Sequence, residues 1–247
     1  MGSSLRAAVL MAALSLTSPI SADALTTAEA GYSTRLEMAL NSRDRAGLAT
    51  LVGPQLQDRL QRRFDRFDAE FPQSSWSVDW LESSTNARPR LRVSVKGIGR
   101  SDGLIYRLQA SQTLAVRLDG GVMVEEEVLD DRSLLRSGTA RLPVSVRMPE
   151  AVLTGSRYDI DVVLDEPLGP AVVAGGLVAL TERQSIDQLR PTIQLEPLGG
   201  GGLFKRVQAP QSPGVQTWAV MLVHPDGLVT STQRVNVVSS KAELARY

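Results

Sequence analysis

The stretch LIYRLQASQTLAVRL, residues 104–118, carries the clearest structural signal in the chain. Its even positions are almost all apolar and its odd positions are mostly polar, which is the two-residue period of a strand with one buried face. Asp119-Gly120-Gly121 follows as a hairpin turn, and alternating valines continue into a return strand. The stretch therefore predicts a long antiparallel hairpin that covers a core with one face.

The sequence before this hairpin has a helical period. Leu56, Leu60, Phe64, Phe67 and Phe71 recur at steps of three and four, which predicts a helix with one apolar stripe. Two further helices are expected before it, and short alternating runs lie between these helices and the hairpin. Helices followed by antiparallel strands are typical of an α+β domain.

Beyond residue 137 the sequence contains a series of short apolar or alternating runs separated by turns rich in glycine and proline. This spacing predicts a β-sandwich of immunoglobulin type, with Trp218, Val220 and Leu222 facing its core. The expected organisation is a signal peptide at residues 1–24, a cone-shaped α+β domain at 25–137, a sandwich at 138–238 and a polar, frayed tail at 239–247.

The N-terminus has the pattern of an export signal. Arg6 precedes the apolar run Ala7 to Leu16, and Ala22-Asp23-Ala24 has the small side chains that signal peptidase recognises. The run is shorter than the roughly 20 apolar residues that span a bilayer. We expect an exported protein with no integral membrane segment after signal removal, located in the periplasm, or in the thylakoid lumen if cyanobacterial.

The composition excludes several kinds of chemistry. The 27 basic and 27 acidic residues balance, which argues against nucleic acid or an anionic membrane as the partner. The chain has no cysteine, so disulfides and thiolate metal sites are excluded, and its single histidine does not make a multi-histidine zinc site. We therefore expect no metal and no cofactor.

The first half resembles the superfold of nuclear transport factor two and the SnoaL-like polyketide cyclases. Asn41, Asp44, Leu48 and Leu51 match the N-x-x-D-x-x-x-L connection often found between its first two helices. The resemblance covers roughly Leu25 to Leu135. It implies three helices and a curved antiparallel sheet that forms a cone, often with a pocket at the open end.

Enzymes of that superfold place His, Asp or Tyr in the pocket, and this sequence has no histidine in that region. The second half resembles an immunoglobulin-like sandwich without the disulfide. The pairing of the two resembles exported proteins of cyanobacteria, and it implies no particular activity.

The predicted cone pocket offers one candidate ligand site, and its geometry depends on strand register. With a three-residue loop at 119–121, Leu114 faces Glu126, and Glu126 points to the apolar side, diagonal to Gln112. A carboxylate there would have a raised pKa and could act as an acid or base. The candidate ligand-binding residues are Trp76, Trp80, Tyr106, Gln112 and Glu126.

A β-bulge is the alternative, since it would shift the register by one and send Glu126 to solvent with Glu125 and Glu127. The acidic run that these residues form with Asp130 and Asp131 is interpreted as a solvated strand edge rather than a calcium site.

Two functional hypotheses follow. The first is a non-catalytic exported binding or scaffold protein that acts through protein–protein contacts, either with another protein or as a homo-oligomer. The second is a small-molecule binder or an enzyme of lyase or isomerase type that uses the cone pocket. No catalytic residue is assigned.

Overall fold

The computed structural model describes residues 22–82, 88–101, 103–138, 143–166, 173–180, 193–198, 202–225 and 227–247. The predicted signal peptide therefore lies almost entirely outside the described residues. The helices are α1 (Ala22–Ser42), α2 (Arg45–Leu51), α3 (Pro54–Glu70) and the short α5 (Lys241–Leu244). The strands are β1 (Gln73–Leu81), β2 (Arg90–Ser101), β3 (Leu104–Asp119), β4 (Val122–Gly138), β5 (Val144–Arg147), β6 (Ala151–Leu153), β7 (Arg157–Leu164), β8 (Ala174–Leu180), β9 (Glu196–Pro197), β10 (Gly202–Gln208), β11 (Gly214–His224) and β12 (Gly227–Val238).

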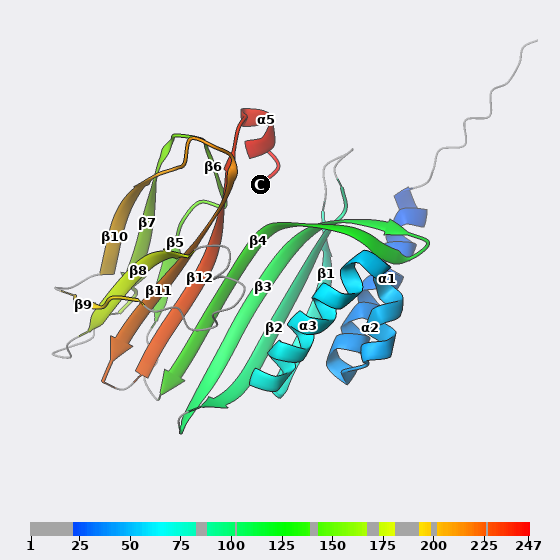
Figure 1. The fold of residues 1–247 in the computed structure, drawn as a ribbon, viewed down its shortest axis with the longest axis horizontal. Coiled ribbons are helices and arrows are strands. Elements are labelled where there is room, and N and C mark those ends of the chain that lie inside the picture. Colours follow the sequence, from blue (N-terminus) through cyan, green and yellow to red (C-terminus); the bar gives the residue numbers. More distant parts are fainter. Residues whose placement is uncertain are drawn as a thin grey trace, which may run out of the picture.

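A nine-stranded sheet runs through both halves of the chain (Figure 1). Its strand order is β1-β2-β3-β4-β12-β11-β8-β9, and β6 pairs in parallel with β12 beside this path. The other neighbours are antiparallel. A second sheet of three strands has the order β10-β7-β5.

The predicted fold class is wrong. The described chain is predominantly β, rather than a helix-plus-cone α+β domain followed by an immunoglobulin-like sandwich. The cause is a pairing between distant segments: β12 forms a ladder with β4 from Gly227 opposite Gly138 to Gln233 opposite Arg132. The sheet of the first half therefore continues into the second. The resemblances to nuclear transport factor two and to the immunoglobulin fold are not supported.

The three N-terminal helices cover one face of the β1–β4 part of the sheet (Figure 1). The apolar stripes of the helices meet the even positions of the long hairpin, as the alternation predicted. Tyr32, Leu91 and Val116 are fully buried in this core. We call this face of the sheet the helix-covered face.

Side chains of α1 protect the outer edge of β1. The Asn41 side-chain amide donates to the Trp76 carbonyl at 2.9 Å and its oxygen accepts from the Trp76 N–H at 2.9 Å, while Glu37 accepts from the Val78 N–H at 2.9 Å. An edge strand with unpaired backbone groups invites another strand, and these bonds occupy the groups that one would use. Asp44 caps α2 by accepting from the Gly47 N–H at 2.9 Å. The Asn41 and Asp44 pattern therefore has local structural roles.

A second core lies between the two sheets, on the face opposite the helices. Trp218 is 4% exposed and donates from its indole N–H to the Tyr158 hydroxyl at 2.9 Å. Val220 and Leu222 are also buried, so the prediction that these three residues face a core is confirmed.

The C-terminal residues, predicted to be a frayed tail, form a capped helix. Ser240 accepts from the Glu243 N–H at 3.2 Å, and the Glu243 carboxylate accepts from the Ser239 N–H at 2.8 Å, which is a capping box displaced by one residue. Arg246 reaches Glu127 of β4 at 3.2 Å, and its carbonyl accepts from Arg90 of β2. The segment therefore attaches to the first half of the chain.

Replacing the buried indole tests the core between the sheets. Trp218→Ala should lower the free energy of unfolding by about 3–5 kcal/mol, because it removes a large buried ring and leaves a cavity. The measurement is urea denaturation of the full chain. Val215→Ala is the matched control, since Val215 lies on the same strand but is 50% exposed, and it should change little. A change near zero for Trp218→Ala would show that this core does not hold the sheets together.

Candidate functional site

The five residues selected from the sequence all lie on the helix-covered face, but they do not come together in one pocket. The ring of Trp76 packs against Phe67 of α3, with centroids 4.9 Å apart, and that of Trp80 lies 6.3 Å from the ring of Tyr32 in α1. Tyr106 is 9% exposed and sits opposite Ser137, near the other end of β3. These aromatic side chains are packed into the core rather than arranged around an opening.

Glu126 points to the helix-covered face, but not in the register expected. It lies opposite Val116, and Leu114 lies opposite Val128. The turn has two residues, Gly120 and Gly121, which shifts the register by one, and a bulge at Val124 shifts it by one more. Two shifts of one residue each leave Glu126 on the same side of the sheet as an unshifted register would. A bulge is therefore present, as the alternative predicted, but it does not send Glu126 to solvent.

The carboxylate of Glu126 is held by an ion pair. Its side chain is 5% exposed, and Oε1 lies 2.6 Å from Nη2 of Arg59 on α3. Burial raises the pKa of the neighbouring Tyr32 far above its usual value, and the negative charge of Glu126 adds to the rise. Glu126 therefore anchors α3 to β4 across the core.

Asp131 also points to the helix-covered face, although the sequence predicted that it lies on a solvated strand edge. A second irregularity near Leu129 turns it inward, opposite Gln112, whose Nε2 donates to Asp131 Oδ2 at 2.9 Å. Burial raises the pKa of Asp131, although the Gln112 hydrogen bond and the charges of Arg63 and Arg234 oppose the rise. This partly buried carboxylate was missed because the side of the sheet to which it points depends on the bulge.

The opposite face of the β1–β4 part of the sheet carries the candidate functional site. A Cβ on Gly97 or Gly99 would touch Phe71 on the helix side, so Lys96, Ile98 and Arg100 point the other way. The strand register brings residues of β1, β3 and β4 beside them. We call this surface the basic face; it consists of Gln73, Lys96, Ile98, Arg100, Arg107, Gln109 and Arg136.

Two arginines stand directly opposite each other on the basic face. Arg107 of β3 pairs in register with Arg136 of β4, and on its other side with Ile98 of β2. Like charges directly opposite on adjacent strands are destabilising. Among the described residues, no carboxylate forms an ion pair with Lys96, Arg100, Arg107 or Arg136.

The carboxylates of β4 on this side of the sheet lie farther along the strand, and each is bonded to an arginine; Asp79 of β1 also lies on this side, opposite Arg92. Asp130 accepts from Arg132 at 2.7 Å, Glu125 from Arg117 at 2.7 Å, and Glu127 from Arg246 at 3.2 Å. Positive charge therefore accumulates at the end of the sheet where β2 turns into β3, although the whole chain is neutral.

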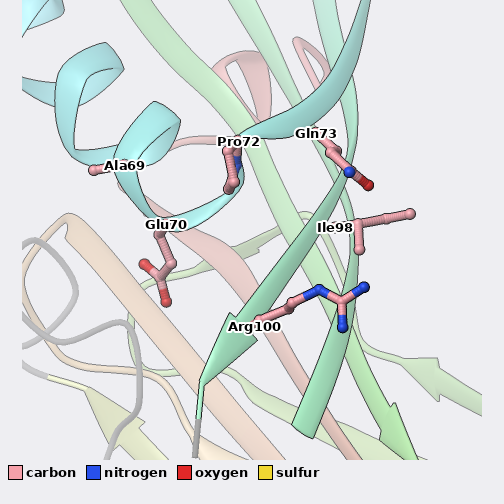
Figure 2. Close-up of a pocket in the computed structure, with 6 residues that line it drawn as sticks. All are labelled: Ala69, Glu70, Pro72, Gln73, Ile98 and Arg100. Carbon is pink, nitrogen blue, oxygen red and sulfur yellow. The ribbon is translucent and has the colours of Figure 1, made fainter. Parts of the chain in front are cut away.

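Two shallow hollows give this end of the sheet its shape. One is lined by Lys96, Arg107 and Gln109 together with the start of β1. The other reaches around the edge of the sheet to the end of α3 (Figure 2). Figure 2 shows Gln73, Ile98 and Arg100 projecting to the same side, away from the Glu70 carboxylate. The five residues predicted from the sequence line neither hollow.

A signal for the basic face was present in the sequence. In β2 the polar positions alternate as Arg90, Arg92, Ser94 and Lys96, followed by Ile98 and Arg100. This predicts a basic strand face, but the opposition of Arg107 and Arg136 requires the register between β3 and β4. On helix α3, Asp65 and Asp68 pair with Arg45 and Arg43 of the preceding segment.

Comparison with known protein families assigns the second half only. Residues 139–238 match a domain of unknown function, DUF8623. Comparison with curated proteins gives no significant match. Among the described residues, no helix is long and apolar enough to cross a membrane.

The partly buried Asp131 carboxylate predicts a pH-dependent stability difference. Because the folded-state pKa of Asp131 is raised, its favourable contribution is present below its ordinary value of 3.8 and is lost as the pH rises through the folded-state value. Asp131→Asn should therefore be more stable than the parent at pH 7, and the difference should shrink on acidification. Urea denaturation from pH 3 to pH 7 measures it. The exposed Asp79→Asn is the control, and lower stability of Asp131→Asn at pH 7 would contradict the expectation.

The opposed arginines predict that one charge reversal stabilises the protein. Arg107→Glu replaces a repulsive cross-strand pair with an attractive one and should raise the free energy of unfolding by about 0.2–1 kcal/mol at low salt. High salt should reduce the gain. Arg157→Glu on β7 is the matched control, because the residue opposite it, Gln208, is neutral. A loss of stability in Arg107→Glu would contradict the proposed repulsion.

Proposed function

We propose that the protein is an exported, non-catalytic binding protein whose basic face holds an acidic segment of a partner protein. The observation that carries the proposal is the direct opposition of Arg107 and Arg136, with Lys96 and Arg100 nearby and no described carboxylate among them. An acidic segment bound over these residues would replace the repulsion with ion pairs.

The chemistry of the face favours a protein partner over other polyanions. Gln73, Gln109 and Ile98 lie between the cations, and Ile98 is 39% exposed. Amide groups and an apolar side chain complement a peptide that carries both carboxylates and apolar groups. The neutral overall charge does not favour nucleic acid, whose binding depends on the release of many counterions.

Binding through arginines needs no catalytic group. Guanidinium groups stay protonated at every physiological pH and donate paired hydrogen bonds to carboxylates. Electrostatic complementarity of this kind increases the association rate and selects partners more than it adds affinity. The apolar run Ala7 to Leu16 near the N-terminus supports an exported location for this activity.

A defined acidic peptide tests the proposal. A synthetic ten-residue peptide of glutamate and leucine should bind the full chain at low salt in a fluorescence anisotropy titration, and the affinity should fall with added salt. The double variant Arg107→Glu/Arg136→Glu should lose this binding by at least about tenfold, which corresponds to 1.4 kcal/mol. The control Arg157→Glu makes a charge change on a distant strand and should bind as the parent does.

Competing probes decide the partner class. Single-stranded DNA and vesicles with anionic lipids are titrated under the same conditions. If either probe binds more tightly than the peptide, and does so through Arg107 and Arg136, the partner is a nucleic acid or an anionic membrane rather than an acidic protein segment. Unchanged peptide binding by the double variant would contradict the basic face as the site.

A further inference from the structure

The strands at the ends of the two sheets, β1, β9, β5 and β10, are protected to different degrees, and β6 beside β12 has only three residues. In the middle of β1 the Trp76 N–H and C=O and the Val78 N–H are bonded to Asn41 and Glu37. β9 has only two residues and ends in Pro197, and β5 has four residues. β10 has seven residues, and no described strand pairs with its outer edge. Of these edge strands, β10 is therefore the longest that α1 does not block.

The hydrogen-bond pattern fixes which backbone groups of β10 face outward. The Ala209 N–H donates to the Ser156 carbonyl at 2.8 Å, on the side of β7. In an antiparallel ladder the residues that bond to the neighbour alternate with those that do not. With the observed register, Val207, Lys205 and Leu203 bond to β7. The N–H and C=O groups of Phe204, Arg206 and Gln208 therefore point to the free edge.

The side chains along this edge are unusual for an unprotected strand. Phe204 is 67% exposed, the largest exposed fraction among the large apolar side chains described. The Lys205 ammonium lies on the other face, 5.4 Å from the centroid of the Trp218 ring. Arg206 is paired with Asp159 at 2.9 Å. The strand thus presents an apolar group on one face, a cation on the other, and no carboxylate of its own.

We propose that β10 binds an extended segment of a second partner protein, which adds to the three-stranded sheet as a further strand. Backbone hydrogen bonds to Phe204, Arg206 and Gln208 provide the affinity, and alternate side chains provide the specificity. The residue of the segment opposite Phe204 is apolar, and the adjacent residue, opposite Lys205, is acidic. This site is separate from the basic face and does not depend on the function proposed for it.

The choice of an acidic and apolar segment rests on charge complementarity. β10 contains Lys205 and Arg206 and no acidic residue. A second copy centred on Lys205 or Arg206 would place each cation opposite itself, which is destabilising. A segment that supplies a carboxylate opposite Lys205 removes that conflict. Such a protein would connect two partners, one on the basic face and one on β10.

Amide hydrogen exchange followed by NMR tests the exposed edge without any ligand. In the free protein the amides of Phe204, Arg206 and Gln208 should exchange quickly, while those of Leu203, Lys205 and Val207 should be protected by their bonds to β7. Equal protection of all six amides would overturn the proposal, because the edge would already be occupied.

A synthetic eight-residue peptide of alternating valine and glutamate then serves as the probe. It should slow exchange at Phe204, Arg206 and Gln208. A version with N-methyl groups on alternate backbone amides should bind at least about tenfold more weakly, because it loses the donors that pair with β10. Equal binding of the two peptides would overturn strand addition.

Two variants separate the backbone contribution from that of the side chain. Arg206→Pro removes an outward N–H that does not bond to β7, whereas Arg206→Ala removes the same guanidinium and keeps the N–H. Arg206→Pro should weaken peptide binding about tenfold relative to Arg206→Ala. Equal binding by the two would overturn the proposal, and the N-methyl peptide gives the answer if the proline variant does not fold.

Arg107→Glu distinguishes this site from the basic face. It should leave the exchange protection of β10 by the valine–glutamate peptide unchanged, and loss of that protection would overturn the separateness of the two sites. Sedimentation of the free protein checks for a second copy on β10. If the free protein is a dimer and Phe204→Ala dissociates it, the strand added to β10 comes from a second copy of the chain. That result would overturn the partner segment proposed here.

Discussion

The pairing of β4 with β12 is the interaction on which the architecture depends. β4 is a long strand, and its edge toward β12 exposes backbone N–H and C=O groups that need partners. β12 supplies them over seven register pairs, although it lies about a hundred residues later in the chain. Without this ladder the first half would end in an open edge, and the two cores would belong to separate sheets. Because the ladder exists, a single sheet determines the position of every other layer.

The two halves cover opposite faces of this sheet. Helices α1–α3 pack on one face of β1–β4, whereas the three-stranded sheet packs on the opposite face of β8, β11 and β12. Among the described residues, no layer therefore covers the other face of the first half, and it is there that Arg107 and Arg136 oppose each other. A solvated sheet face has no packing requirement of its own, so its side chains are available for binding. The basic face is thus a consequence of how the layers are distributed.

Local periodicity predicted the elements well, and it failed where distant strands meet. The alternation in residues 104–118 and the burial of Trp218 follow from nearest neighbours in the sequence. The β4–β12 ladder leaves no such local pattern, because the strand that pairs with β4 lies far away in the sequence and its choice depends on the fold of the whole chain. The cone and sandwich interpretation treated each half as closed, which is why it was wrong. The facing of Glu126 and Asp131 depends on two register irregularities, which alternation alone does not locate.

The contrast between β1 and β10 bears on the strand addition proposed above. Both are edge strands, but Asn41 and Glu37 occupy the backbone of β1, while the outward groups of β10 lie beside an exposed Phe204. Since β1 is blocked and no described strand pairs with the outer edge of β10, the proposed strand addition would be directed to β10. The opposed arginines are a comparable feature at another surface, because like charges directly opposite are destabilising and the proposed anionic partner would offset that repulsion. In both places the described part of the chain shows groups without a described partner, and the binding partners proposed above would supply one.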